Sequence, residues 1–224
     1  MMMTWNSFYL MPLVPTIIAI IAYAWRRIKK KNILWLIESV ACSCALICMI
    51  VFFLTGEEQG ILWFLVIAFL VSILGDLIMK TQKADRKLLL GIPAFTVAHI
   101  FFLIYIIKSS GFSWLPFLIL LVPFLGFFYI VLLPTPRMKK NKKLAVAGCL
   151  YIAISCLTLA AAVYGVSNIA SRWVFLAAVV CLVISDFMIA FRELYEHNQL
   201  NKAIMPLYYI CHILIAVSVV INYM

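Results

Sequence analysis

The sequence has few charged side chains, because Asp, Glu, Lys and Arg together make up only 12% of its 224 residues. A soluble domain averages about 25% charged and about 45–50% apolar residues. Here 67% of the residues are hydrophobic and the mean hydropathy is +1.14. So little charge cannot cover the surface of a soluble protein of this length, which excludes that class. We therefore expect lipid to surround most of these side chains.

Several motifs of well-understood chemistries are also missing. The sequence contains no glycine-rich phosphate loop, no G-x-S-x-G elbow and no H-E-x-x-H zinc helix. No lysine lies in the middle of an apolar run, which excludes a Schiff base to retinal. The seven cysteines form no C-x-x-C pair, so we interpret them as small apolar packing residues. Any chemistry must therefore come from other side chains.

Eight apolar runs are each long enough to cross a bilayer, which takes about 20 mostly apolar residues in helical form. They cover residues 8–25, 33–54, 61–79, 88–107, 115–133, 144–164, 173–191 and 206–223. No basic residue precedes the first run, so we expect it to remain as a helix and not to be cleaved as a signal peptide. The short connections leave no room for a soluble domain. The sequence therefore predicts an all-α integral membrane protein of eight transmembrane helices, a single domain over residues 1–224.

The net charge of +10 is concentrated in alternate connections. Sixteen of the 18 Lys and Arg residues fall within 26–31, 80–87, 137–143 and 192–202, whereas only Lys108 and Arg172 belong to the other set. This distribution is typical of membrane orientation, so we predict no nucleic-acid partner. By the positive-inside rule, the basic connections face the cytoplasm and both termini lie outside. The predicted location is the bacterial cytoplasmic membrane or its equivalent.

The two halves of the sequence resemble each other. A proline, an aromatic residue and a histidine occur twice with identical internal spacing: Pro93, Phe95 and His99, then Pro206, Tyr208 and His212. One segment earlier in each half stand Asp76 and Asp186, and both kinds of match are separated by close to half the chain. Since each half has four helices, both halves run in the same direction. We predict two parallel four-helix repeats, approximately 1–112 and 113–224, related by a pseudo-two-fold axis along the membrane normal.

Ionisable side chains inside a bilayer are costly, so they are candidates for function. The apolar runs contain five of them: Glu38, Asp76, His99, Asp186 and His212. From the run boundaries, all but His99 are predicted within about 5–10 Å of the cytoplasmic boundary, and His99 deeper. The sequence therefore predicts a site between the two halves, toward the cytoplasmic side.

Two carboxyls that share a pocket of low dielectric constant do not both ionise easily, so one of Asp76 and Asp186 is expected to keep its proton. A protonated acid beside an ionised base suits the hydrolysis of an acid-labile ether. Helix-end polarity or an interhelical hydrogen bond is the structural alternative for both aspartates. Glu38 is either a third site carboxylate or a partner of loop arginines. His99 and His212 are either site residues or hydrogen-bonded core residues.

Four tyrosines lie in or near these segments. Tyr208 and Tyr209 are one turn from His212, while Tyr105 and Tyr151 lie within other apolar runs. Because a tyrosine hydroxyl in lipid needs a polar partner, we expect one or two of them to line the pocket. Tyr208 and Tyr209 are therefore included as supporting residues of the predicted site.

On these residues the sequence resembles the YhhN family of membrane proteins. The resemblance rests on short motifs in a fixed order: Gly75-Asp76, then Phe95 and Ala98-His99 with Tyr105, then Ser185-Asp186, and finally Tyr208-Tyr209. It extends over nearly the whole chain and includes the eight-helix count.

The resemblance implies a lysoplasmalogenase, because the characterised members of the family have that activity. Such an enzyme hydrolyses the vinyl ether bond of a lysoplasmalogen and releases a fatty aldehyde and a glycerophospho-ethanolamine or -choline. Asp76 and Asp186 would then be the catalytic pair, one as acid and one as base, without a cofactor or metal. Their division of labour would be like that of the two carboxylates of a glycosidase. The partners it implies are a lysophospholipid substrate and the bilayer, and the oligomeric state stays open.

Three other functions compete with this one. Asp76, His99, Asp186 and His212 could together bind zinc in a metal-dependent lysolipid hydrolase. Parallel repeats with intramembrane carboxylates are also found in proton-coupled transporters of small solutes or lipids. A purely structural membrane scaffold is the third, and it leaves the intramembrane acids unexplained.

Overall fold

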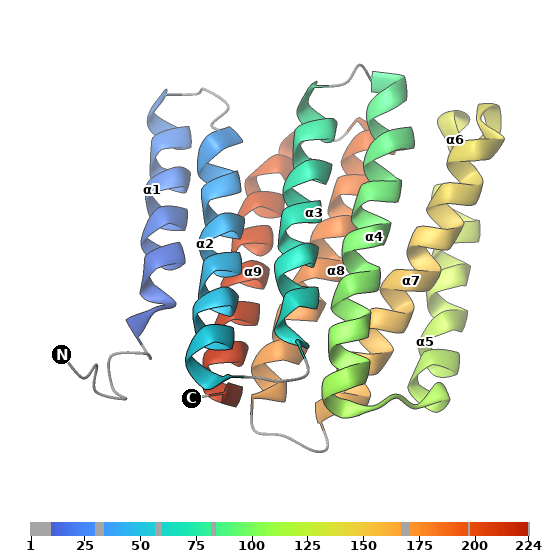
Figure 1. Cartoon of the computed structure of the whole chain (residues 1–224). Helices are drawn as coiled ribbons and strands as arrows, with labels where there is room; N and C mark the ends of the chain where they lie inside the picture. Colours follow the sequence, from blue (N-terminus) through green and yellow to red (C-terminus); the bar gives the residue numbers. More distant parts are fainter. Residues whose placement is uncertain are drawn as a thin grey trace.

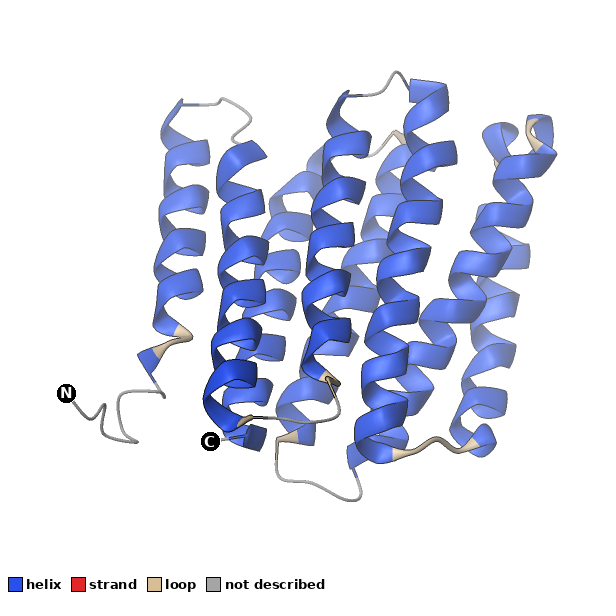
Figure 2. Ribbon diagram, in the orientation of Figure 1, coloured by secondary structure: helices blue, strands red, loops and turns tan. Residues whose placement is uncertain are grey.

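The computed structural model describes residues 10–29, 34–56, 60–81, 84–166, 171–196 and 198–223. Within these ranges the chain is helical and forms no strand (Figure 2). The α-helices are α1 (Leu13–Lys29), α2 (Leu34–Thr55), α3 (Leu62–Thr81), α4 (Ala84–Ser110), α5 (Trp114–Phe127), α6 (Pro136–Lys140), α7 (Lys142–Val166), α8 (Arg172–Tyr195) and α9 (Asn201–Tyr223). A π-helical turn, η2 (Phe128–Leu132), extends α5, and a 3₁₀ turn, η3 (Asn198–Leu200), precedes α9.

Within the described residues, seven segments are long and apolar enough to cross a membrane. They are Glu38–Thr55, Leu62–Thr81, Arg86–Ser110, Trp114–Leu132, Lys142–Gly165, Arg172–Tyr195 and Lys202–Tyr223. The predicted class, an all-helical integral membrane protein, is therefore confirmed. The first predicted segment, 8–25, falls partly outside the described residues, and its apolar helical part, Leu13–Trp25, is shorter than a full span. The count of eight thus stays a prediction for α1.

The helices pack as neighbours along the chain within each half. In the first half α1 packs on α2, α2 on α3, and α3 on α4, and in the second half α5 packs on α7, α7 on α8, and α8 on α9. Helix α1 also touches α9, but the two main contacts between the halves are those of α4 with α7 and of α2 with α9 (Figure 1). Both contacts pair the fourth helix of one predicted repeat with the second helix of the other. A site built from α3, α4, α8 and α9 therefore lies between the halves.

The ends of the bundle differ in charge. In Figure 1 the start of α1 and the end of α9 lie at the same end, whereas the end of α3, the start of α4, α6 and the start of α7 lie at the opposite end. The latter is called the basic end below, because Lys80, Arg137, Lys139 and Lys140 are placed there. This separation of charge agrees with the sequence. Which end faces the cytoplasm remains the prediction of the positive-inside rule.

Glycine permits close contact between α3 and α4 next to the first aspartate. A Cβ added to Gly75 would lie 2.8 Å from the ring of Phe95, closer than side-chain carbons approach one another. One turn nearer the basic end, a Cβ on Gly91 would lie 2.6 Å from the sulfur of Met79. These two glycines let the helices approach closely, as small residues do in membrane bundles. The close approach fixes Asp76 relative to α4.

Candidate functional site

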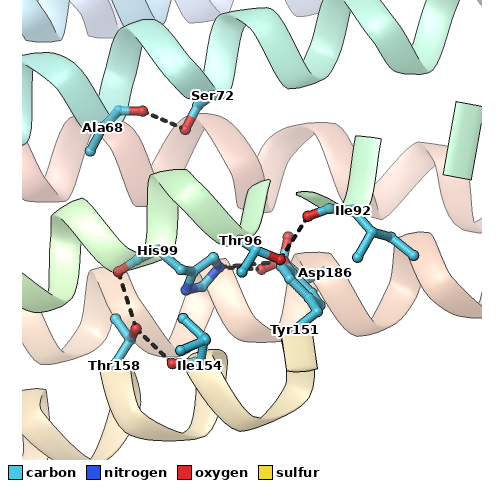
Figure 3. Close-up of polar contacts among 9 residues, drawn as sticks. All are labelled: Ala68, Ser72, Ile92, Thr96, His99, Tyr151, Ile154, Thr158 and Asp186. Carbon is cyan, nitrogen blue, oxygen red and sulfur yellow. Dashed lines mark hydrogen bonds and ion pairs between the residues drawn. The ribbon is translucent and has the colours of Figure 1, made fainter. Parts of the chain in front are cut away.

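The second aspartate is hydrogen-bonded to a histidine from the other half of the chain. Asp186 on α8 lies 3.0 Å from Nε2 of His99 on α4, measured at Oδ2, and the two side chains are only 9% and 2% exposed. The hydroxyl of Tyr151 on α7 lies 3.4 Å from the same nitrogen. Figure 3 shows the three side chains converging from three helices. Together they form the Asp186 cluster.

The geometry of His99 indicates which nitrogen carries its proton. Its Nδ1 is buried and has no hydrogen-bond partner among the described residues. An unpaired buried N–H is less tolerable than an unpaired lone pair, so the proton belongs on Nε2. From there the N–H donates to Oδ2 of Asp186. The backbone of His99 is held as well, because Thr158 donates to its carbonyl at 3.5 Å (Figure 3).

The first aspartate has a tyrosine as its partner. The hydroxyl of Tyr208 on α9 donates to Oδ2 of Asp76 on α3 at 2.7 Å. Nδ1 of His212 lies 2.8 Å from the carbonyl of Tyr208, and since a carbonyl only accepts, Nδ1 carries the proton. Asp76, Tyr208 and His212 form the Asp76 cluster. Nε2 of His212 is buried without a hydrogen-bond partner within the described ranges.

The two clusters are close enough to influence each other. The carboxyl of Asp76 lies within electrostatic range of Lys80, Glu38 and Asp186. Glu38 on α2 is half-buried, and its Oε1 has no hydrogen-bond partner in the part of the chain that the structure describes. The alternative role of Glu38 was as a partner of loop arginines. The side chains of the arginines after the first apolar run lie outside the described residues, so this role is untested. Tyr209, the other predicted supporting residue, lies in the apolar core.

One of the two aspartates lines a cavity between helices of both halves. A mostly apolar cavity lies between α3, α4, α6, α7 and α8, and it encloses about 750 Å³ when the space open to the outside is counted. Among the residues that line it, Asp186 is the one carboxyl, and Tyr151 and Ser155 lie near it on α7. Asp76 does not line this cavity, although its neighbours Met79 and Phe95 do. Of the predicted pair, Asp186 is therefore the member at the wall of this cavity.

The depth prediction needs a correction. His99 was expected deeper than Asp186, yet the two side chains are in contact. Both helices are four residues longer at this end than predicted, since α8 continues to Tyr195 and α4 begins at Ala84, so their ends lie at different levels and a residue count from them does not give relative depth. Asp186 is thus nine residues, about 13 Å, before the end of its helix. His212 is similarly deeper, because α9 begins at Asn201 and not at 206.

The sequence reasoning did not select Tyr151 as a site residue. It stood only among tyrosines that could line the pocket. The sequence does contain a signal for Tyr151. Glu38 and Tyr151 have the same separation as the two histidines, so Tyr151 occupies the position in the second half that Glu38 occupies in the first. The hydroxyl groups of Thr96 and Ser72, by contrast, are bonded to the backbone of their own helices, at Ile92 and Ala68 (Figure 3).

The four residues considered as zinc ligands are divided between the two clusters. No group of three or more His, Cys, Asp or Glu side chains in the described ranges is arranged to hold a metal ion. His99 and His212 each use one nitrogen for a protein hydrogen bond, to Asp186 and to the Tyr208 carbonyl. The arrangement thus gives two separate hydrogen-bonded pairs, and it does not form a single ligand set.

Comparisons with known proteins give a family but no close relative. Neither the curated proteins nor the solved structures contain a significant match to the chain. The sequence model of the YhhN family matches residues 37–219, which is most of the chain and includes both clusters. The chain therefore belongs to the YhhN family.

Proposed function

We propose that this protein hydrolyses the vinyl ether bond of lysoplasmalogens, releasing a fatty aldehyde and a glycerophospho-alcohol. Membership of the YhhN family supports a lysoplasmalogenase-like membrane protein. One structural observation carries the proposal further. Asp186, hydrogen-bonded to buried His99, is the carboxyl on the wall of an otherwise largely apolar cavity.

The cavity suits an amphiphile with a single chain. It is partly open to the outside, so one end of a ligand can stay at the surface while its chain lies inside. Its wall is formed mainly by aliphatic and aromatic side chains, among them Ile92, Phe95 and Phe187. A fatty chain is compatible with these contacts, and its ether oxygen would be placed near Asp186.

The first chemical step is protonation of a carbon. A vinyl ether is cleaved when its outer alkene carbon takes a proton, which leaves an oxocarbenium ion. Because two carboxyls inside one helix bundle do not both ionise easily, we assign one shared proton to the pair of Asp76 and Asp186. Asp186 delivers it, because Asp186 is the member of the pair at the cavity wall. With Oδ2 of Asp186 accepting from His99, the transferable proton occupies the other oxygen, Oδ1.

The second step adds water. The carboxylate left on Asp186 stabilises the adjacent oxocarbenium ion and accepts a proton from the attacking water. The product is a hemiacetal, which collapses to the aldehyde as a proton passes from its hydroxyl to the glycerol oxygen. One water is consumed, and Asp186 ends with the proton it began with. Throughout, the negative charge on Asp76 favours the cationic intermediate.

The remaining predicted residues support this chemistry indirectly. His99 orients Asp186, Tyr208 orients Asp76, and His212 fixes the carbonyl of Tyr208. Glu38 adds a second acidic group near Asp76. Tyr209 lies in the apolar core around the site, and its supporting role stays a prediction.

The finer architecture belongs to the same proposal. We place eight spans in the membrane as two parallel repeats, with both termini outside and the cavity toward the cytoplasm. The symmetric pairing of α4 with α7 and α2 with α9 supports the repeats. The basic connections at one end support the orientation.

The test is product analysis with purified protein. A lysoplasmalogen and an ester lysophospholipid of equal chain length are supplied separately, and fatty aldehyde and fatty acid are measured. We expect aldehyde from the first, no fatty acid from the second, and no aldehyde from the Asp186→Asn variant. Glu196→Gln, which removes an exposed acid just beyond α8, serves as the control and should retain activity. Fatty acid release from the ester, or no aldehyde from folded wild-type protein, would contradict the proposal.

A further inference from the structure

One buried hydroxyl at the wall of the cavity has no hydrogen-bond partner. Oγ of Ser155 on α7 is buried, and nothing in the described part of the chain donates to it or accepts from it. Ser155 lines the cavity together with Asp186 and Tyr151. A buried hydroxyl without a partner costs about 1–3 kcal/mol, so its partner is expected among the groups that enter the cavity.

Ser155 differs in this respect from other hydroxyls on the helices. A serine or threonine in a helix often donates to a carbonyl three or four residues earlier, as Ser72, Thr96 and Thr158 do in Figure 3. The same bond is made by Thr16, Ser43, Thr55, Thr81, Ser109 and Ser218. Ser155 could donate in this way to the carbonyl of Tyr151, and it does not. Its hydroxyl is therefore available to a ligand in the cavity.

Tyr151 brings this hydroxyl next to the carboxyl of Asp186. It precedes Ser155 by four residues on α7, so the two side chains lie on the same face of the helix. The hydroxyl of Tyr151 lies 3.4 Å from Nε2 of His99 and near both Asp186 and Ser155, without a hydrogen bond to Ser155. Figure 3 shows Tyr151 beside Asp186. Asp186, Tyr151 and Ser155 are called the polar strip below, because the other residues that line the cavity are apolar.

The matching place in the first half of the chain has no such hydroxyl. At the spacing that relates the two histidines, Ser155 corresponds to Cys42 and Tyr151 corresponds to Glu38. Cys42 is exposed on its helix, whereas Ser155 is buried. The polar strip therefore accompanies Asp186, the aspartate that lines the cavity.

A water molecule at the polar strip would have the partners that it needs for attack. After the outer alkene carbon has taken the proton of Asp186, the carbon attached to the ether oxygen is open to a nucleophile. A water in a mostly apolar cavity needs at least two polar partners to be held there. The ionised carboxylate of Asp186 can accept one of its hydrogen bonds and Oγ of Ser155 the other. This arrangement leaves a lone pair of the water oxygen for the carbon.

We infer that Ser155, with Tyr151 beside it, binds the water that attacks the oxocarbenium ion. This inference rests on the proposed function, because it names the residue that holds the second reactant of the same site. As the carbon–oxygen bond forms, one proton of the water passes to Asp186 and the other stays on the hemiacetal hydroxyl. The hemiacetal then breaks into the aldehyde and the glycerol hydroxyl, so that one water is consumed.

Competition between water and methanol tests the inference. Attack by methanol on the oxocarbenium ion gives a mixed methyl acetal, whereas attack by water gives the aldehyde. Water can donate to both Asp186 and Ser155, but methanol has a single donor, so the wild type should favour water. The nucleophile enters after the protonation, so the ratio of acetal to aldehyde reports this step whichever step limits the rate. Purified protein is supplied with lysoplasmalogen in water containing methanol, and mass spectrometry measures both products.

Three variants locate the bound water. Ser155→Ala removes one acceptor and leaves apolar space for the methyl group, so the ratio of acetal to aldehyde should rise about tenfold, the effect of about one hydrogen bond. Ser155→Thr keeps the hydroxyl and should keep the ratio. Ser218→Ala is the matched control and should also keep it, because it removes a similarly buried hydroxyl that is bonded within α9. Thermal denaturation checks that each variant is folded, and Ser155→Gly replaces Ser155→Ala if the latter does not fold.

Three results would overturn the inference. They are a wild-type ratio in the folded variant that lacks the Ser155 hydroxyl, an equal rise in Ser218→Ala, and an equal rise in Ser155→Thr. A lower rate with an unchanged ratio belongs to the first case, since it indicates that Ser155 only supports the fold of the site. Failure of the proposed function looks different, because the wild type then forms neither aldehyde nor acetal, and the inference fails with it.

Discussion

The two aspartates occupy matching places in the predicted repeats, yet their surroundings differ. Asp186 accepts from a histidine, lies beside a tyrosine and lines the cavity. Asp76 accepts from a tyrosine and lies away from the cavity wall. In both clusters the partner comes from the fourth helix of the other half. The same kind of helix contact therefore surrounds the two carboxyls differently, and it leaves Asp186 at the wall of this cavity.

The difference traces to single residues at matching positions of the two halves. At the spacing that relates the two histidines, Tyr208 corresponds to Phe95, and Tyr151 corresponds to Glu38. In the Asp76 cluster the hydroxyl comes from α9, whereas in the Asp186 cluster the corresponding position on α4 is Phe95, whose ring packs on Gly75. With no hydroxyl at that position, Asp186 bonds to His99 one turn further along α4.

The largest expected effect comes from replacing the two aspartates themselves. Asp186→Asn should lower the rate of aldehyde release by about 10³-fold, since it removes the group that transfers the proton. Asp76→Asn should lower it by about 10–100-fold, because only a distant charge is lost. The measurement is the initial rate of aldehyde release by each variant, with thermal denaturation to check that each variant is folded. Equal losses would mean that both carboxyls contact the substrate and that the assigned asymmetry is wrong.

The next prediction concerns the partner of Asp186. His99→Gln keeps a donor of similar reach but loses the ring, and it should reduce kcat about tenfold with little change in KM. Because His99 positions Asp186 and does not touch the substrate, binding of a saturated ether analogue of the substrate, which cannot be hydrolysed, should be unchanged. The corresponding change in the other cluster, His212→Gln, is the matched control. It should have a smaller effect on kcat, since His212 contacts only the backbone of Tyr208.

A third prediction compares the residues that precede the aspartates. Gly75→Ala should destabilise the protein by about 1–3 kcal/mol, because the new methyl group would overlap the ring of Phe95. Ser185→Ala should cost only about 0.5–1.5 kcal/mol, as it removes one long hydrogen bond to the carbonyl of Ile204. Denaturation midpoints in detergent measure both. Adding Phe95→Leu to Gly75→Ala should recover part of the loss, and no recovery would mean that the close helix contact is not the cause.

The sequence was sufficient to predict the fold at the level of apolar runs. Each predicted run from 33–54 onward corresponds to one helix long enough to span, because only a closed helix satisfies the backbone in lipid. It did not predict α6, which lies in a basic connection between Pro134 and the start of α7. Nor did it predict the π-helical turn before it. A short helix such as α6 is stabilised by individual packing contacts, here that of buried Met138. Such contacts leave no long apolar run in the sequence from which the helix could be predicted.

The site could be predicted only in part. The cost of ionisable groups in lipid identified Glu38, both aspartates and both histidines without coordinates. Which side chains meet depends on how each helix is rotated about its axis. That rotation is poorly determined for α8, which is apolar on most faces, so the contact of Asp186 with His99 and the place of Tyr151 needed the structure. The assignment of the cavity to Asp186 alone depended on it as well.

The smallest expected effect comes from removing the hydrogen bond that Asp76 accepts. Tyr208→Phe removes the hydroxyl that donates to Asp76, and it makes the position identical to Phe95 in the first half. Because Asp76 acts through its charge, the loss of one hydrogen bond should lower kcat by about three- to tenfold and leave KM unchanged. Tyr129→Phe, at an exposed tyrosine of η2, is the control and should behave as wild type. A loss as large as that of Asp186→Asn would show that Tyr208 contacts the reacting bond, and Asp76 would then have to reach the cavity in the working enzyme.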